Sequence, residues 1–93
     1  MARFIVIHNV AVEEMSQEQL VDLAKQVMVR LKPGVEWISS WYTSEANKLF
    51  CDWEAPDEEA IRAALGEALK VYPIEAVHSV IYINPAWYAE QSW

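Results

Sequence analysis

The sequence has 93 residues, of which 14 are acidic and 7 are Lys or Arg, so its formal net charge is -7. This length accommodates one small domain, and a hydrophobic fraction of 54% is too high for a disordered chain. The acidic balance excludes a protein that binds duplex DNA or RNA, because no basic surplus exists to displace counterions from phosphates, and it disfavours anionic lipid surfaces.

The first third of the chain predicts a strand and a helix. Residues 3–10 are rich in Phe, Ile and Val and carry apolar side chains on both faces, which is typical of a buried strand. Ser16 and Gln19 form a capping box at the start of a helix. Apolar residues then recur at helical spacing until the Pro33-Gly34 pair, which ends this helix.

The middle of the chain predicts a hairpin and a second helix. Residues 35–43 are β-branched and aromatic, as in a strand, and a turn at 44–47 leads to a return strand over 48–54. Residues 55–59 open a helix, with a proline in its first turn and acidic side chains at the positive end of the helix dipole. Tyr72-Pro73 ends that helix.

A last strand is predicted over residues 75–83, which gives the order β-α-β-β-α-β. This is the ferredoxin-like, split β-α-β arrangement of the α+β class. Right-handed crossovers place the strands in the order fourth, first, third, second. The chain is therefore expected to form a single domain over residues 1–93, with a short aromatic tail at 84–93.

One face of the predicted sheet is covered by both helices, and the other face is open; alternate residues of a strand lie on opposite faces. We expect Ile5 and Ile7 to face the helices. The charge on Asp52 places it on the open face and puts Cys51 inside, as a small core residue. The open face is then expected to carry Phe4, Val6, His8, Trp37, Ser39, Trp41, Phe50, Asp52, His78, Val80 and Tyr82.

The two histidines are expected to lie side by side on this face. The first and fourth strands are antiparallel neighbours, and a register that pairs Phe4 with Tyr82 also pairs His8 with His78. His8, His78 and Asp52 are candidate metal ligands, since imidazole and carboxylate groups suit nickel, copper or zinc; the alternative is a pair of half-buried structural histidines. The expected ligand pocket is formed by His8, Trp37, Ser39, Trp41, Phe50, Asp52, His78 and Tyr82.

An apolar face of this size predicts a homodimer joined through the two sheets, with a pocket between them for a small molecule or a metal ion. Trp87, Tyr88 and Trp93 of the tail are expected to dock on their own domain or on the partner. Two other classes stay open: a cofactor-free isomerase or monooxygenase that uses a pocket histidine on a small aromatic or apolar substrate, and a purely structural dimerisation module.

Three segments resemble a small bacterial ferredoxin-like family, mostly of unknown function, that includes a nickel-binding protein. These segments are residues 37–41, 48–51 and 55–61. The resemblance implies a dimeric α+β barrel and binding of a divalent metal such as nickel. Members of that family often carry histidines where this chain has Ser39 and Ala64, so two potential ligands are absent here.

The remaining signals concern location and acidic clusters. Cys51 is the sole cysteine, so no internal disulfide is possible, and no apolar run approaches the roughly 20 residues of a membrane span. The first residues read as a strand rather than a signal peptide, and we expect a cytoplasmic protein. The acidic pair Glu13-Glu14 and the 57–59 run are expected to be a loop and a helix start rather than a cation site.

Overall fold

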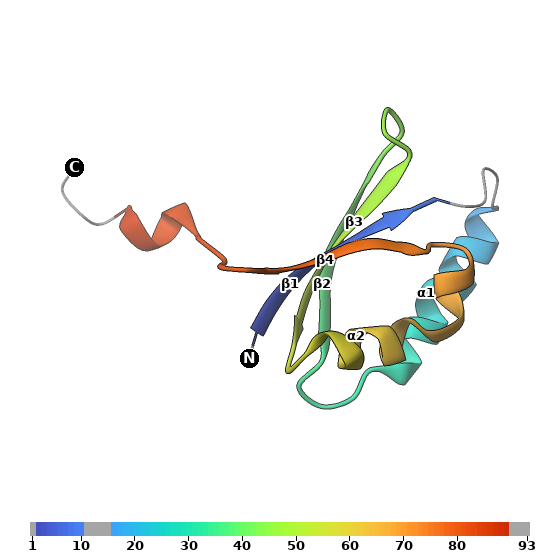
Figure 1. Ribbon diagram of the computed structural model, residues 1–93, viewed down its shortest axis with the longest axis horizontal. Helices are drawn as coiled ribbons and strands as arrows, with labels where there is room; N and C mark the ends of the chain where they lie inside the picture. The colour runs from blue at the N-terminus through green and yellow to red at the C-terminus, as the bar shows by residue number, and fades with distance from the viewer. Residues whose placement is uncertain (1, 11–15, 90–93) are drawn as a thin grey trace.

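A four-stranded antiparallel sheet carries two helices on one of its faces (Figure 1). The computed structural model describes residues 2–10 and 16–89; the predicted acidic pair Glu13-Glu14 and Trp93 of the tail lie outside these ranges. The elements are β1 (Ala2–Asn9), α1 (Gln17–Arg30), β2 (Glu36–Thr43), β3 (Lys48–Ala55), α2 (Glu58–Leu65), the 3-10 helix η1 (Gly66–Lys70), β4 (Ile74–Val80) and the 3-10 helix η2 (Pro85–Tyr88).

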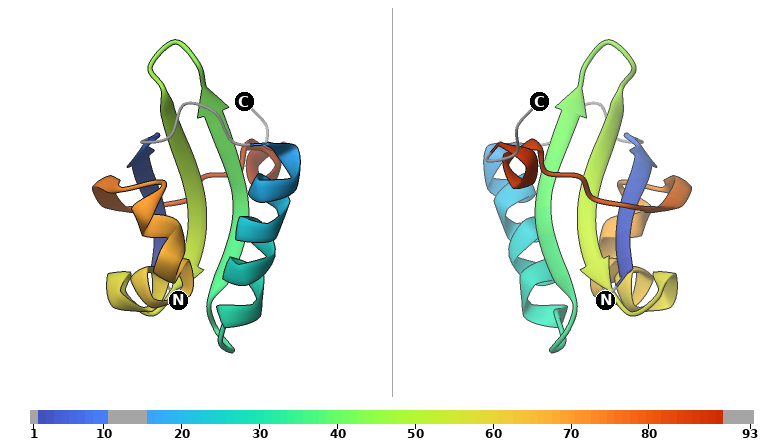
Figure 2. Two further views of the ribbon diagram at one scale, coloured as in Figure 1. Left: turned by 90° about the vertical axis from the view of Figure 1, so that its right-hand side faces the viewer. Right: turned by 90° about the vertical axis from the view of Figure 1, so that its left-hand side faces the viewer.

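The strand order is β2-β3-β1-β4, which confirms the predicted topology. Figure 2 shows that α1 runs along the β2 side of the sheet, whereas α2 and η1 lie on the β1 and β4 side. The two helices are thus spread across one face instead of stacking over its centre. This arrangement leaves room between α1 and the sheet, and the candidate site lies there.

The start of α1 follows the capping signal in the sequence. The Ser16 hydroxyl accepts a hydrogen bond from the Gln19 backbone amide at 3.1 Å, and the Gln19 side chain accepts one from the Ser16 amide at 3.0 Å. Both donors are among those that a helix N-terminus leaves unpaired. Of the side chains on α1, only Val27 is fully buried, so the predicted apolar stripe of this helix is not packed tightly on the sheet.

The second helix is shorter than predicted, because Gly66 interrupts it. Gly66 has a φ of +50°, a conformation that favours glycine, and α2 ends there before the chain continues as η1. The guanidinium of Arg30 donates to the carbonyl oxygens of Ala64 and Leu65 at 3.4 and 3.2 Å. Pro56 lies just before the N-cap residue Asp57, rather than in the first turn of the helix.

The face assigned to β1 was wrong. Phe4, Val6 and His8 are buried against the helices, whereas Ile5 and Ile7 face the open side. The registers account for this, since Val6 pairs with Cys51 and Ile5 pairs with Asp52. Asp52 and Phe50 do lie on the open side and Cys51 lies inside, as predicted.

Trp37 also lies on the face opposite to the one predicted. The pairing of β2 with β3 shifts between Trp37 and Ser39, so Ile38 forms a bulge. Trp37 therefore pairs with Trp53 on the helix side, while Ser39 and Trp41 remain on the open side opposite Asp52 and Phe50. The indoles of Trp37 and Trp53 stack at 6.1 Å between centroids, with an angle of 12° between their planes.

The fourth strand ends earlier than predicted, at Val80. Residues 81–84 leave the sheet as an extended segment, and the chain then forms η2; Figure 1 shows this orange-to-red segment projecting away from the side of the sheet opposite the helices. Ile81 and Ile83 are 88% and 65% exposed. Within residues 2–10 and 16–89, no helix is long and apolar enough to cross a membrane.

Candidate functional site

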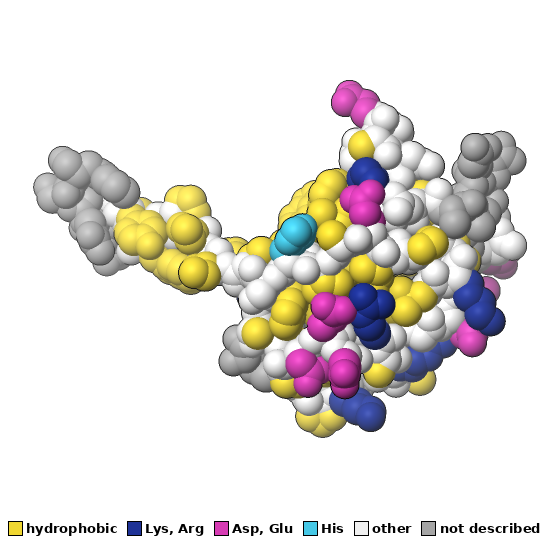
Figure 3. All heavy atoms as spheres, viewed as in Figure 1, with side chains coloured by type: hydrophobic (Ala, Val, Ile, Leu, Met, Phe, Trp, Pro, Cys, Tyr) yellow, Lys and Arg dark blue, Asp and Glu magenta, His cyan; other side chains and the backbone are white. Residues whose placement is uncertain are grey.

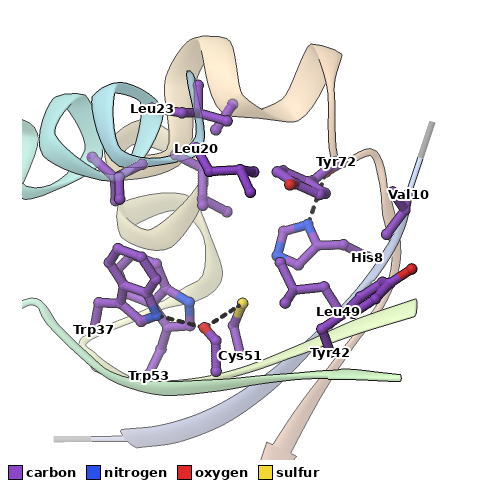
Figure 4. Close-up of a pocket in the computed structure, with 15 residues that line it drawn as sticks. His8, Val10, Leu20, Leu23, Trp37, Tyr42, Leu49, Cys51, Trp53 and Tyr72 are labelled. Atoms are coloured by element: carbon purple, nitrogen blue, oxygen red, sulfur yellow. Dashed lines mark hydrogen bonds between the residues drawn. The ribbon is translucent and has the colours of Figure 1, made fainter. Parts of the chain in front are cut away.

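A cavity of about 420 Å³ lies between the sheet and the helix layer. Its volume falls in the range of small-molecule sites, and it is partly open to solvent beside α1, where Leu20 is 40% exposed. We call it the helix-side cavity (Figure 4). It is lined by His8, Val10, Leu20, Leu23, Ala24, Val27, Trp37, Ser40, Tyr42, Leu49, Cys51, Trp53, Leu65, Ala68 and Tyr72.

His8 supplies a buried imidazole to the wall of this cavity. The residue is 1% exposed, and its Nδ1 atom lies 2.8 Å from the backbone carbonyl oxygen of Tyr72. A carbonyl oxygen only accepts, so Nδ1 carries the proton and donates it. Burial lowers the pKa of His8, and the bond to Tyr72 opposes that shift without cancelling it. The ring is therefore neutral near pH 7, with a lone pair on Nε2.

A short hydrogen-bonded chain runs along the opposite wall. The indole Nε1 of Trp37 donates to the Ser40 hydroxyl at 2.8 Å, and that hydroxyl donates to Sγ of Cys51 at 3.0 Å. Burial raises the pKa of the Cys51 thiol, and the bond from Ser40 lowers it by less. A neutral thiol is a weak nucleophile, so Cys51 is a polarisable wall residue, in agreement with its predicted place in the core.

Two polar atoms of residues that line the cavity have no partner among residues 2–10 and 16–89. Nε2 of His8 and Nε1 of Trp53 are both buried, and neither makes a hydrogen bond within these ranges. Such groups are rare because each costs the free energy of lost hydration. Figure 4 shows His8 on one side of the cavity, with Trp53 and Cys51 on the other. The cavity thus offers one acceptor and one donor in an otherwise apolar space.

The open face of the sheet is a separate surface. We define it by Arg3, Ile5, Ile7, Ser39, Trp41, Phe50, Asp52, Ala76, His78 and Val80, which the registers place on one side. Arg3 donates two hydrogen bonds to the carboxylate of Asp52, at 2.7 and 2.8 Å, and its guanidinium lies 4.4 Å from the ring centroid of Tyr82. Trp41 is 56% exposed, and Figure 3 shows hydrophobic side chains gathered beside the hollow between the sheet and the projecting segment.

The structure divides the predicted ligand pocket between these two surfaces. His8 and Trp37 line the helix-side cavity, whereas Ser39, Trp41, Phe50, Asp52 and His78 lie on the open face, and Tyr82 follows the end of β4. The register between β1 and β4 pairs Ile5 with His78 and His8 with Ile74. The prediction that His8 and His78 lie side by side was therefore wrong, because the two imidazoles occupy opposite faces of the sheet.

The three predicted metal ligands do not form a site. His8 and His78 are on opposite faces, and Arg3 already engages both oxygens of Asp52. Of the two positions where a histidine was noted as missing, Ser39 lies on the open face and Ala64 is buried in α2. Among residues 2–10 and 16–89, no group of three or more His, Cys, Asp or Glu side chains is placed to hold a metal ion, so these residues of one chain supply no complete set of metal ligands.

Several cavity residues were not predicted as a site. Leu20 and Leu23 belong to the apolar spacing predicted for the first helix, Tyr72 belongs to the pair predicted to end the second helix, and Tyr42 lies in the strand predicted over residues 35–43. The spacing of these residues in the sequence does not indicate that a cavity separates α1 from the sheet. Trp53 alternates with Cys51, so its inward direction could have been predicted, but its unpaired indole N–H could not.

Comparison with known proteins gave one family and one fold. The model of the family described as "Nickel responsive protein SCO4226-like" matches residues 4–80. The solved structure of SCO4226 from Streptomyces coelicolor A3(2) superposes with a TM-score of 0.68 at 19% sequence identity, covering 89% of this chain and all of that one. At 19% identity, this structural similarity shows that the two chains share a fold. A search of curated proteins found no match.

Proposed function

The chain belongs to the SCO4226-like family of nickel responsive proteins, and we propose that it is a small homodimeric binding protein whose ligand occupies the helix-side cavity. The observation that carries this proposal is the cavity itself. It is lined almost entirely by apolar and aromatic side chains, with a few polar atoms on its walls, which is the usual composition of a small-molecule site.

The packing of α1 supports a ligand in this space. Leu20, Leu23 and Ala24 turn toward the cavity, yet none of them is fully buried. Apolar surface left partly in water costs about 25 cal/mol for each Å² that a ligand would cover. A small apolar molecule would therefore complete the core between α1 and the sheet.

A neutral fluorescent molecule, N-phenyl-naphthylamine, tests the proposal. We expect saturable binding of one molecule per chain, with the enhanced emission that an apolar site produces. Ala24→Phe, which fills the cavity from α1, is expected to abolish binding. The matched control is Ala63→Phe on the exposed side of α2, which should bind as the wild type does. Binding that both variants retain would contradict the cavity as the site, and recovery of a chemically altered probe would favour the enzymatic alternative.

The open face supports the dimeric part of the proposal. Ile5, Ile7 and Phe50 form an apolar strip beside Trp41, and the exposed segment from Ile81 projects over the same side. Exposed apolar patches of this kind mark interaction sites. A second copy is an occupant with a matching patch, since pairing about a two-fold axis buries the same surface on both chains.

Light scattering coupled to gel filtration tests the dimer. We expect twice the mass of one chain at micromolar concentration, and the mass of a single chain for Trp41→Glu, which places a charge in the strip. Val29→Glu makes the same kind of change on α1, where Val29 is 84% exposed, and should leave the dimer intact. A wild-type chain that elutes as a monomer would remove this part of the proposal, while binding in the cavity would be judged separately.

Nickel is the second candidate ligand, because the family is described as nickel responsive. The described residues supply no group of three donors, and His78 is the exposed imidazole of the described chain. Calorimetric titration with Ni²⁺ near neutral pH distinguishes the two ligands. A saturable heat that His78→Asn reduces would support nickel, and a flat titration of the wild-type protein would remove it.

A further inference from the structure

The two unpaired atoms of the helix-side cavity specify the chemistry of its ligand. Nε2 of His8 and Nε1 of Trp53 belong to residues that are 1% and 0% exposed, so bulk water does not satisfy them. A buried polar atom without a partner costs free energy in every folded molecule. Both residues line the cavity that we have proposed as the binding site.

The role of each atom follows from its neighbours. Nδ1 of His8 donates to the carbonyl oxygen of Tyr72, so in the neutral ring Nε2 is an acceptor. The indole Nε1 of Trp53 carries a hydrogen and is a donor only. Trp37 is the contrasting case, since its indole N–H already donates to Ser40. A ligand therefore meets one free acceptor and one free donor.

The two residues leave the sheet at well-separated backbone positions. Trp53 pairs with Phe4, and His8 lies four residues farther along β1, a backbone separation of roughly 13 Å at the rise of a strand. Figure 4 shows the two side chains on opposite sides of the space. One polar group at each end of an apolar body suits this arrangement better than a single polar group.

The charge of the ligand is limited by the lining. None of the described side chains on the wall is an Arg, Lys, Asp or Glu, and burial favours the neutral forms of His8 and Cys51. A carboxylate or ammonium group in such a space loses its hydration without gaining a counter-charge. A charged ligand is therefore disfavoured.

We propose, on the basis of the binding function above, that the cavity takes a neutral, largely apolar molecule with a hydroxyl at one end and a carbonyl-type acceptor at the other. The hydroxyl donates to Nε2 of His8, and the carbonyl oxygen accepts from Nε1 of Trp53. The apolar body lies against α1 and the aromatic wall. Both unpaired atoms then gain the partner that the described part of the chain does not supply.

A series of compounds on one skeleton tests this assignment: naphthalene, naphthol, acetylnaphthalene, hydroxy-acetylnaphthalene and naphthoate. Each added hydrogen bond is expected to tighten binding roughly two- to tenfold, so the compound with both groups binds tightest and naphthoate weakest. Displacement of N-phenyl-naphthylamine from the full-length protein gives the dissociation constants.

Two variants separate the two contacts. In His8→Asn the amide nitrogen can keep the donation to Tyr72 while the acceptor at the Nε2 position is lost, so only the advantage of the hydroxyl should disappear. In Trp53→Phe only the advantage of the carbonyl should disappear. Trp87→Phe is the matched control, because Trp87 lies in η2, outside the cavity, and is 57% exposed, so both advantages should survive in it.

The outcomes distinguish this inference from the proposed function. If no compound of the series and no apolar probe binds, the cavity is not a binding site and both proposals fail. If all the neutral compounds bind with equal affinity, the cavity is a binding site but the polar assignment is wrong, as it would be if ordered water held both atoms. Tightest binding of naphthoate would also overturn the assignment.

Discussion

The imidazole of His8 on β1 donates through Nδ1 to the backbone carbonyl oxygen of Tyr72, 2.8 Å away in the segment that leads into β4. The ring of Tyr72 meets the same imidazole edge to face, with centroids 6.4 Å apart and 74° between the planes. This contact fixes which nitrogen carries the proton, and it turns the other nitrogen toward the helix-side cavity. One hydrogen bond thus joins the sheet to the end of the helix layer and sets the polarity of the cavity wall.

Protonation of His8 is expected to destabilise the fold. Burial lowers the pKa of His8 in the folded protein, so the unfolded chain takes up a proton at a higher pH than the folded chain does. Between those two pKa values the unfolded state holds more protons, and the free energy of unfolding falls as pH falls. We expect a decrease that starts near pH 6.5 and reaches at most about 1.4 kcal/mol per pH unit, measured by urea denaturation between pH 7.5 and pH 5.5.

Two variants check the origin of this pH dependence. His8→Asn keeps a donor for the Tyr72 carbonyl and does not titrate in this range, so its stability should vary less with pH than that of the wild type. His78→Asn removes the histidine of the open face and leaves His8 in place, so the slope should remain. A slope carried by His78 instead would contradict the assignment of the neutral, buried state to His8.

The topology of the sheet could be predicted from the sequence, whereas the face of β1 and the position of Trp37 on β2 were predicted wrongly. On β1, the aliphatic character of Ile5 and Ile7 suggested the helix side, but Arg3 shares their alternation. A charged Arg3 faces away from a helix-covered core, where Asp52 accepts its hydrogen bonds. The charge of Arg3 therefore indicates the face of β1 more reliably than the aliphatic character of Ile5 and Ile7 does.

The bulge at Ile38 and the place of α1 had no comparable signal. A bulge reverses the alternation beyond it, so Trp37 and Trp41 lie on opposite faces although they are four residues apart. The apolar spacing of α1 predicts which side of the helix faces inward, not how far the helix lies from the sheet. The cavity therefore depends on tertiary distances that a pattern of residues does not encode.

Gly66→Ala is expected to destabilise the protein by about 1–3 kcal/mol. Gly66 has a φ of +50°, and a Cβ atom there would lie 2.9 Å from the guanidinium carbon of Arg30. The same substitution at Gly34, which also has a positive φ (+85°), provides a comparison for the backbone strain without Arg30. Chemical denaturation measures both changes. An Arg30→Ala background should reduce the cost of Gly66→Ala, and equal costs in both backgrounds would exclude a clash with Arg30.

The ion pair between Arg3 and Asp52 is expected to stabilise both the sheet and the start of the projecting segment. The side chains are 20% and 10% exposed, the contact is bidentate, and the guanidinium also lies against Tyr82. We expect Asp52→Asn to cost about 1–3 kcal/mol, because one Arg3 donor then faces an amide N–H₂ group. A double-mutant cycle with Arg3→Met should show a coupling free energy above about 0.5 kcal/mol.

An exposed pair provides the comparison for that cycle. Arg62 and Glu58 form an i,i+4 contact at 2.7 Å with side chains that are 46% and 44% exposed, where solvent screens the attraction. Glu58→Gln is expected to change stability little. If the Arg62 pair and the Arg3 pair gave the same coupling, burial and bidentate geometry would have no role in the strength of the Arg3 contact.

Alkylation of Cys51 is expected to report on occupancy of the helix-side cavity. Cys51 is 3% exposed, and burial raises the pKa of its thiol. Iodoacetamide at pH 8 therefore reacts with it only after a local opening of the fold. An opening that costs about 3 kcal/mol slows the reaction roughly a hundredfold relative to the unfolded chain. Saturating N-phenyl-naphthylamine should slow it further, because the ligand covers the sulfur and stabilises the closed state. In the control, Cys51→Ala with Ser44→Cys on the exposed hairpin turn, the rate should be that of a free thiol and independent of the probe. Fast labelling of Cys51 in the folded wild-type protein, or labelling that a bound probe leaves unchanged, would show that the cavity does not enclose this side chain as described.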